Sequence, residues 1–145
     1  MNMNDPTVRA SVRYGWTMLA VFMLGGLTLA LLLSIKFSPY IAVPIRRELW
    51  ALAHAHGALL ALINLPFAAF APACIPDERK RRFAGFMLRW GSFIMPLGFF
   101  LGGLWPSTEG EPSPLIALVF LGGLMVIHAM AACAAGAWRA GNAAT

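Results

Sequence analysis

The sequence predicts an all-α fold, an integral membrane four-helix bundle. Three observations predict it: the composition, four long apolar runs, and the gathering of most charges between those runs. Of the 145 residues, 59% are hydrophobic and only 12% are charged, whereas about 25% of the residues of a soluble domain are charged. A helix needs roughly 20 apolar residues to cross a hydrocarbon core of about 30 Å. Four such spans use nearly the whole chain, so residues 1–145 are expected to form a single transmembrane domain.

The predicted spans cover residues 16–35, 49–73, 83–105 and 114–138. The first is too long for the apolar region of a typical signal peptide, and no small-residue cleavage site follows it. Pro39 and Pro44 interrupt the chain before the second span. A charged turn at residues 76–82 precedes the third span, and an acidic turn at residues 106–113 precedes the fourth. Because backbone groups in lipid must hydrogen-bond within the chain, each span is expected to be helical.

The distribution of lysine and arginine predicts that both ends of the chain are cytoplasmic (N-in/C-in). The side that holds both termini carries seven of these residues: Arg9, Arg13, Arg79, Lys80, Arg81, Arg82 and Arg139. The opposite side carries three: Lys36, Arg46 and Arg47. Cytoplasmic segments carry the excess of positive charge, so the first side is expected to be cytoplasmic. The positive charge behind the net value of +5 lies in short segments between apolar runs, which is typical of membrane orientation, so nucleic acid is not an expected partner.

Small residues are expected to mark the contacts between helices, because they let two helices approach closely. The clearest are three glycine pairs, Gly25–Gly26, Gly102–Gly103 and Gly122–Gly123. Short connections make consecutive helices antiparallel neighbours. Cys74 and Cys133 have neither zinc-site nor disulfide spacing, and they are expected to be small apolar fillers.

Few polar side chains lie inside the predicted spans, and such groups are costly in lipid and usually functional. They are His54, His56, Asn64, Arg89 and His128. Residues two apart on a helix point about 200° apart, so His54 and His56 cannot face one internal site in the same way. One is expected to bind inward and the other to face a neighbouring helix or subunit. His128 is offset in depth by about 11 Å, which disfavours a haem held by two histidines.

Three interpretations of the histidine pair remain open, and haem ligation is the leading one. A single axial histidine leaves the opposite iron face open for a substrate or for Lewis-acid chemistry. Gly57 would let a flat macrocycle approach beside His56, which makes His56 the first candidate ligand and His54 the second. The alternatives are a hydrogen bond between helices, and a copper, zinc or proton-relay site. Zinc pairs prefer i, i+4 spacing.

The other polar residues have both a structural and a functional interpretation. Asn64 lies eight residues after His56, about 80° round the helix, and is expected near the same pocket. Arg89 is expected either to extend toward the cytoplasmic surface or to bind an acidic group of a cofactor or lipid. His128 is expected to hydrogen-bond a facing carbonyl or hydroxyl group.

Over residues 49–138 the chain resembles the styrene oxide isomerase and hydroxylaminobenzene mutase group of small membrane enzymes. The likeness lies in Ala53-His54-Ala55-His56-Gly57, in the turn from Asp77 to Arg82, in Phe99 to Pro106 and in Gly122 to Gly136. The resemblance implies a homotrimer of four-helix subunits with haem b between them. The chain departs from the family in the spacing of Asn64, and it lacks a tyrosine near Phe99.

We therefore expect a haem-binding membrane isomerase or mutase that acts on a small apolar substrate of the epoxide or hydroxylamine type. The resemblance implies that ferric haem b, bound by His56 or His54 beside Gly57, is the Lewis acid. Asn64 is expected to orient the bound oxygen, and a bacterial inner membrane is the expected location. The alternative is a non-catalytic accessory or assembly subunit with structural histidines. A transporter is disfavoured, because no span holds an acidic residue and no paired broken helices are present.

Overall fold

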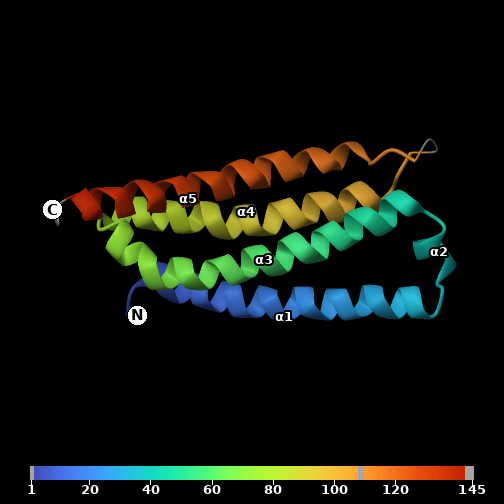
Figure 1. Ribbon diagram of the computed structural model, residues 1–145, viewed down its shortest axis with the longest axis horizontal. Coiled ribbons are helices and arrows are strands. Elements are labelled where there is room, and N and C mark those ends of the chain that lie inside the picture. The colour runs from blue at the N-terminus through green and yellow to red at the C-terminus, as the bar shows by residue number, and fades with distance from the viewer. Residues whose placement is uncertain (1, 108–109, 143–145) are drawn as a thin grey trace.

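Helices are the only regular structure in the described part of the chain, and consecutive long helices run antiparallel (Figure 1). The computed structural model describes residues 2–107 and 110–142, with side chains up to residue 139. The helices are α1 (Pro6–Ser34), the short α2 (Ser38–Ile41), α3 (Pro44–Cys74), α4 (Glu78–Leu104) and α5 (Leu118–Asn142), which follows a 3-10 turn, η1 (Pro114–Ala117). Four of them are long and apolar enough to cross a membrane, as predicted.

Three of the long helices begin before the apolar runs that predicted them, because capping residues and prolines start them. The Asp5 carboxylate accepts hydrogen bonds from the backbone N–H groups of Thr7 at 2.8 Å and Val8 at 3.3 Å, so α1 begins at Pro6. Pro44 lies at the first position of α3, where its fixed φ suits a helix and its missing N–H costs nothing. Asp77 caps α4 by accepting from the Lys80 N–H at 2.9 Å.

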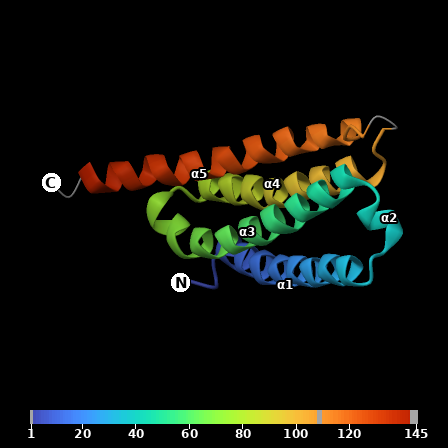
Figure 2. The same cartoon turned by 45° about the vertical axis from the view of Figure 1, so that its right-hand side comes forward.

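The helices pack in the order α1, α3, α4, α5, and the bundle is open. Helix α1 packs mainly on α3 and lightly on α4, and no described part of it contacts α5. Figures 1 and 2 both show the two termini at one end and α2 at the other. The predicted set of four helices is thus present, but they do not close into a ring.

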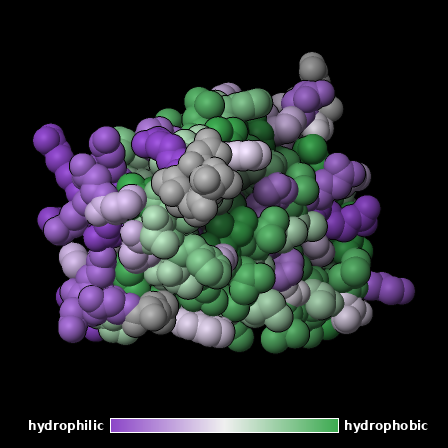
Figure 3. All heavy atoms as spheres, turned by 60° about the vertical axis from the view of Figure 1, so that its left-hand side comes forward, coloured by the Kyte–Doolittle hydropathy of each residue, from purple (hydrophilic) through white to green (hydrophobic). Residues whose placement is uncertain are grey.

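Large apolar side chains cover much of the outer surface. Leu27 is 67% exposed and Phe120 is 75% exposed, and in Figure 3 apolar side chains cover most of the face between two hydrophilic edges. The largest apolar patch on a typical soluble monomer is only about 300–600 Å². The long apolar helices with this outer surface indicate an integral membrane protein.

A cluster of buried apolar residues lies toward the terminal end, between α3, α4 and α5. Its buried residues are Phe67, Ala71, Ile75, Ala84, Leu88 and Ala129, and Cys74 and Cys133 pack against them. This is the filler role predicted for the cysteines. Helices α4 and α5 approach through Gly122, where an added Cβ would lie 2.5 Å from the backbone nitrogen of Met95.

The predicted glycine contacts are confirmed at only some positions. Gly26, Gly102, Gly103 and Gly122 each lie against a neighbouring helix or turn. A Cβ added at Gly25 or at Gly123 would meet nothing within 4 Å. In two of the three pairs, therefore, one glycine makes the contact and the other faces open space.

Candidate functional site

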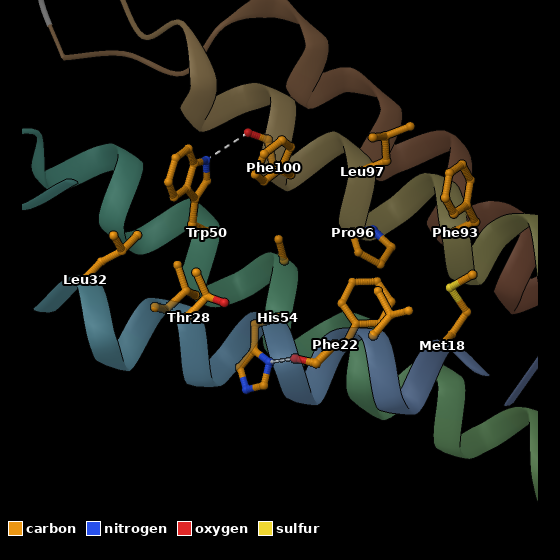
Figure 4. Close-up of a pocket in the computed structure, with 14 residues that line it drawn as sticks. Met18, Phe22, Thr28, Leu32, Trp50, His54, Phe93, Pro96, Leu97 and Phe100 are labelled. Atoms are coloured by element: carbon orange, nitrogen blue, oxygen red, sulfur yellow. Dashed lines mark hydrogen bonds between the residues drawn. The ribbon is translucent and has the colours of Figure 1, made fainter. Parts of the chain in front are cut away.

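His54 belongs to a contact between α3 and α1. Its Nδ1 lies 2.7 Å from the carbonyl oxygen of Phe22. Because a carbonyl oxygen only accepts, Nδ1 carries the hydrogen and donates it. The ring lies so close to Gly26 that an added Cβ there would overlap it. Figure 4 shows the imidazole against α1, with its Nδ1 toward the Phe22 carbonyl.

Two further side chains repeat this arrangement along the seam between α1 and α3. The ring of Phe22 fills the space at Gly57, and the end of Leu65 fills the space at Gly15, where an added Cβ would lie 2.7 Å from Leu65 Cδ2. The side chain of Phe22, and not an open approach for a macrocycle, therefore occupies the space beside Gly57. In this structure Gly57 serves helix packing.

His56 points to a different helix, as the 200° separation predicted. Its Nδ1 lies 3.0 Å from the Leu52 carbonyl oxygen of its own helix, and its ring packs on Phe99 of α4 with centroids 4.9 Å apart. The side chain is partly exposed, and its Nε2 makes no hydrogen bond with the described residues. His56 thus has one ring nitrogen without a hydrogen-bond partner among the described residues.

Asn64 lies in the buried contact between α3 and α4. Its Nδ2 donates to the Leu60 carbonyl at 2.8 Å and to Ser92 Oγ at 3.1 Å. Its Oδ1 is buried and has no hydrogen-bond partner among the described residues. No hydrogen bond joins Asn64 to either histidine there, so its place beside a shared pocket stays a prediction.

A cavity of about 430 Å³ lies between α1, α3 and α4 (Figure 4). Three polar donors of its lining residues are already bonded to backbone carbonyls: Thr28 to Leu24 at 2.9 Å, Trp50 to Phe100 at 3.1 Å, and His54 Nδ1 to Phe22. Its other lining residues are apolar. Of the predicted site residues it includes His54, but not His56, Gly57 or Asn64. The cavity therefore suits an apolar occupant.

Arg89 belongs to a second polar group, with Ser11 and Tyr14 of α1. The sequence predicted a polar role for Arg89 but not for the other two. The Nη1 of Arg89 donates to Ser11 Oγ of α1 at 3.1 Å. Tyr14 lines a cavity of about 310 Å³ with Arg89, Trp90 and Phe93. The Tyr14 hydroxyl is buried and has no partner among the described residues. Tyr14 was missed because an aromatic residue at the edge of a span is typical of the membrane interface.

His128 is exposed and meets the edge of Phe83, with ring centroids 5.3 Å apart. The described residues offer it no hydrogen bond, so the predicted bond to a facing carbonyl or hydroxyl group is not seen. In residues 2–107 and 110–142 no three histidine, cysteine or acidic side chains gather into a metal-binding group. This finding concerns only metal sites built from three or more protein side chains. A haem needs one protein ligand, so the finding does not test haem binding.

No protein-family model matches the chain, and neither a similar curated protein nor a similar solved structure was found.

Proposed function

We propose that this protein is a haem-binding membrane isomerase or mutase, with His56 as the axial ligand of haem b. The observation that carries the proposal is the free Nε2 of a partly exposed ring whose Nδ1 is bound to the Leu52 carbonyl. A hydrogen bond at one imidazole nitrogen sets the tautomer that leaves the other nitrogen for a metal. His54 shows the same pattern, with its Nδ1 bonded to the Phe22 carbonyl, so the packing around each ring decides between the two.

The surroundings of His56 fit a ligand at the surface of the subunit. Phe99 holds the plane of the ring, and the exposed edge would face a second copy in the proposed homo-oligomer, for which a trimer is expected. A bound haem would supply a Lewis-acidic ferric iron with an open position opposite the histidine. His54 fits this role poorly, because its ring is held against Gly26.

The remaining assignments belong to the same proposal. Positive charge on the terminal side supports an N-in/C-in orientation, and a bacterial inner membrane is the proposed location. The substrate class is a small apolar epoxide or hydroxylamine. Asn64 keeps its predicted role of orienting an oxygen, which the ligand assignment does not require.

An absorption spectrum of the detergent-purified protein, oxidised and reduced, tests the proposal. We expect a Soret band, as purified or after hemin is added, that is lost in His56→Ala and kept in His54→Ala. His128→Ala is the control for removal of an exposed histidine. A colourless protein that does not respond to hemin would remove the proposal, and so would a Soret band that survives in His56→Ala.

A non-catalytic accessory or assembly subunit is the second candidate, and the contact of His54 with α1 favours it. Polar side chains do join helices in membranes. This candidate expects no bound cofactor at any stage, and a loss of complex formation when His54 and His56 are both replaced by leucine. A coloured wild-type protein, with a double variant that folds but is colourless, would count against it.

A further inference from the structure

Two cavities lie end to end along the seam between α1 and α4. The smaller is polar at one side, with Tyr14 and Arg89 in its wall. The larger is apolar, and Phe93 lines both cavities. Figure 4 shows Met18 facing Phe93 at one end of the larger cavity, with Leu32 and Trp50 at the other. The two cavities adjoin at Phe93, one with a polar side and one long and apolar, and we call them together the α1–α4 groove.

Arg89 brings a positive charge to the polar end that no described carboxylate neutralises. The ion pairs among the described residues involve Arg81 and Arg82, and the one hydrogen bond of Arg89 goes to the Ser11 hydroxyl. A guanidinium has five N–H donors, so most of its donors remain available. The Tyr14 side chain lines the same cavity, and its buried hydroxyl has no hydrogen-bond partner among the described residues. The polar end is therefore complementary to an anion.

The polar end lies where a lipid headgroup would meet the helix. Tyr14 lies between the exposed Arg13 and Trp16, and arginine and tryptophan side chains mark the membrane interface. From Met18 to Leu32 the larger cavity follows α1 for roughly 21 Å. One leaflet of a hydrocarbon core of about 30 Å is shorter than this, so a single acyl chain fits along the groove.

We propose that the α1–α4 groove binds an anionic phospholipid. Its phosphate accepts hydrogen bonds from the Arg89 guanidinium beside the Tyr14 ring, and one acyl chain lies in the larger cavity. Arginine suits phosphate because its planar N–H groups bond two oxygens at once. The Thr28 hydroxyl, the Trp50 indole N–H and the His54 Nδ1–H each donate to a backbone carbonyl, so an acyl chain leaves none of these donors unpaired. The site lies in the leaflet on the side of the termini.

Native mass spectrometry of the detergent-purified full chain tests the site by titration with phosphatidylglycerol, phosphatidylcholine with the same acyl chains, or palmitate. We expect one tightly bound phosphatidylglycerol, with an apparent Kd at least tenfold lower than for the other two lipids. Arg89→Gln should raise that Kd about tenfold, and Arg89→Lys should raise it less. Arg139→Gln is the matched control, because Arg139 is an exposed arginine near the end of α5 that lines neither cavity.

A second pair of variants tests the acyl chain without touching the charge. Gly25 lines the larger cavity, and a Cβ there meets nothing within 4 Å. Gly25→Leu should therefore fill the groove and weaken phosphatidylglycerol binding severalfold. Gly123→Leu, at an equally open glycine of α5, should leave it unchanged. Three results would overturn the proposal. They are equal binding of all three lipids, wild-type affinity in both Arg89→Gln and Gly25→Leu, and a changed oligomer mass in Gly25→Leu with unchanged lipid binding. The last result would assign the groove to a second copy of the chain.

Discussion

Helix α1 faces two neighbours, and only one of the two seams is closed. Toward α3, large side chains meet glycines in register, as His54 meets Gly26 and Phe22 meets Gly57. Toward α4, large side chains line both walls and Gly25 faces open space, so cavities remain. The comparison teaches that glycine alone does not close a contact between helices. A large side chain must meet it from the opposite helix.

Filling a glycine position in the closed seam should have the largest effect. At Gly57 even a Cβ would overlap the ring of Phe22, and overpacking a filled contact costs about 1–3 kcal/mol. Because leucine adds three more carbons, we expect Gly57→Leu to lower the free energy of unfolding by about 3 kcal/mol. Thermal unfolding in detergent measures this loss of stability. Gly123→Leu is the control and should unfold near the wild-type temperature; similar melting of both variants would show that the seam tolerates the added volume.

The second effect concerns the ion pair that holds the start of α1. Arg81 Nη2 lies 2.8 Å from Asp5 Oδ2, and both side chains are nearly buried, at 11% and 12% exposed. The same arginine donates to the Ile75 and Pro76 carbonyls at the end of α3. We expect Asp5→Asn, which keeps a helix cap, to cost about 2 kcal/mol at pH 7.

The pH dependence of this pair has a definite sign. Burial raises the pKa of Asp5, but hydrogen bonds from the Thr7 and Val8 N–H groups and from Arg81 outweigh it, so the pKa lies below its ordinary value of 3.8. The unfolded chain therefore binds the proton more tightly, and stability is lost as the pH falls below 3.8 through the folded pKa. Unfolding measured at pH 7 and at pH 3 should show the gap between wild type and Asp5→Asn narrowing in acid. A gap that stays constant would mean that the charge of Asp5 contributes nothing.

The helices could be predicted from the sequence because lipid requires long apolar runs. Their starting points could not, since the polar first turns of α1 and α4 depend on the caps Asp5 and Asp77. Hydropathy does not detect such caps. The interruption predicted at Pro44 is the start of α3, because proline ends a helix from inside but suits its first turn.

The divergence of the two histidines was predictable from helix geometry, and their partners were not. A separation of 200° requires different faces, but the sequence does not say which helix packs on each face. The Phe22 ring lies beside Gly57, and Tyr14 and Arg89 line one cavity, because of how α1 packs on α3 and α4. Such contacts follow from tertiary structure and carry no local pattern.

Removing the hydrogen bond of the closed seam should have a smaller effect than overpacking it. His54→Ala loses the bond from Nδ1 to the Phe22 carbonyl, and contacts of this kind between membrane helices contribute about 1 kcal/mol. We expect a loss of that size in thermal unfolding. His128→Ala, at an exposed ring, is the control, and a His54→Ala protein as stable as that control would leave the seam dependent on glycine packing alone.

The smallest effect is expected in the open seam. A methyl group at Gly25 would contact nothing within 4 Å, so Gly25→Ala adds no clash and gains helix propensity, which is about 0.5–1 kcal/mol for this exchange. We expect stability equal to wild type or higher by that amount, against a clear loss in Gly26→Ala, where the added carbon overlaps the His54 ring. The two adjacent substitutions differ only in the seam they face. If both variants unfold at the same temperature, the closed and open seams do not differ in packing. The space at Gly25 would then be filled in the protein, and the α1–α4 groove would not be a cavity.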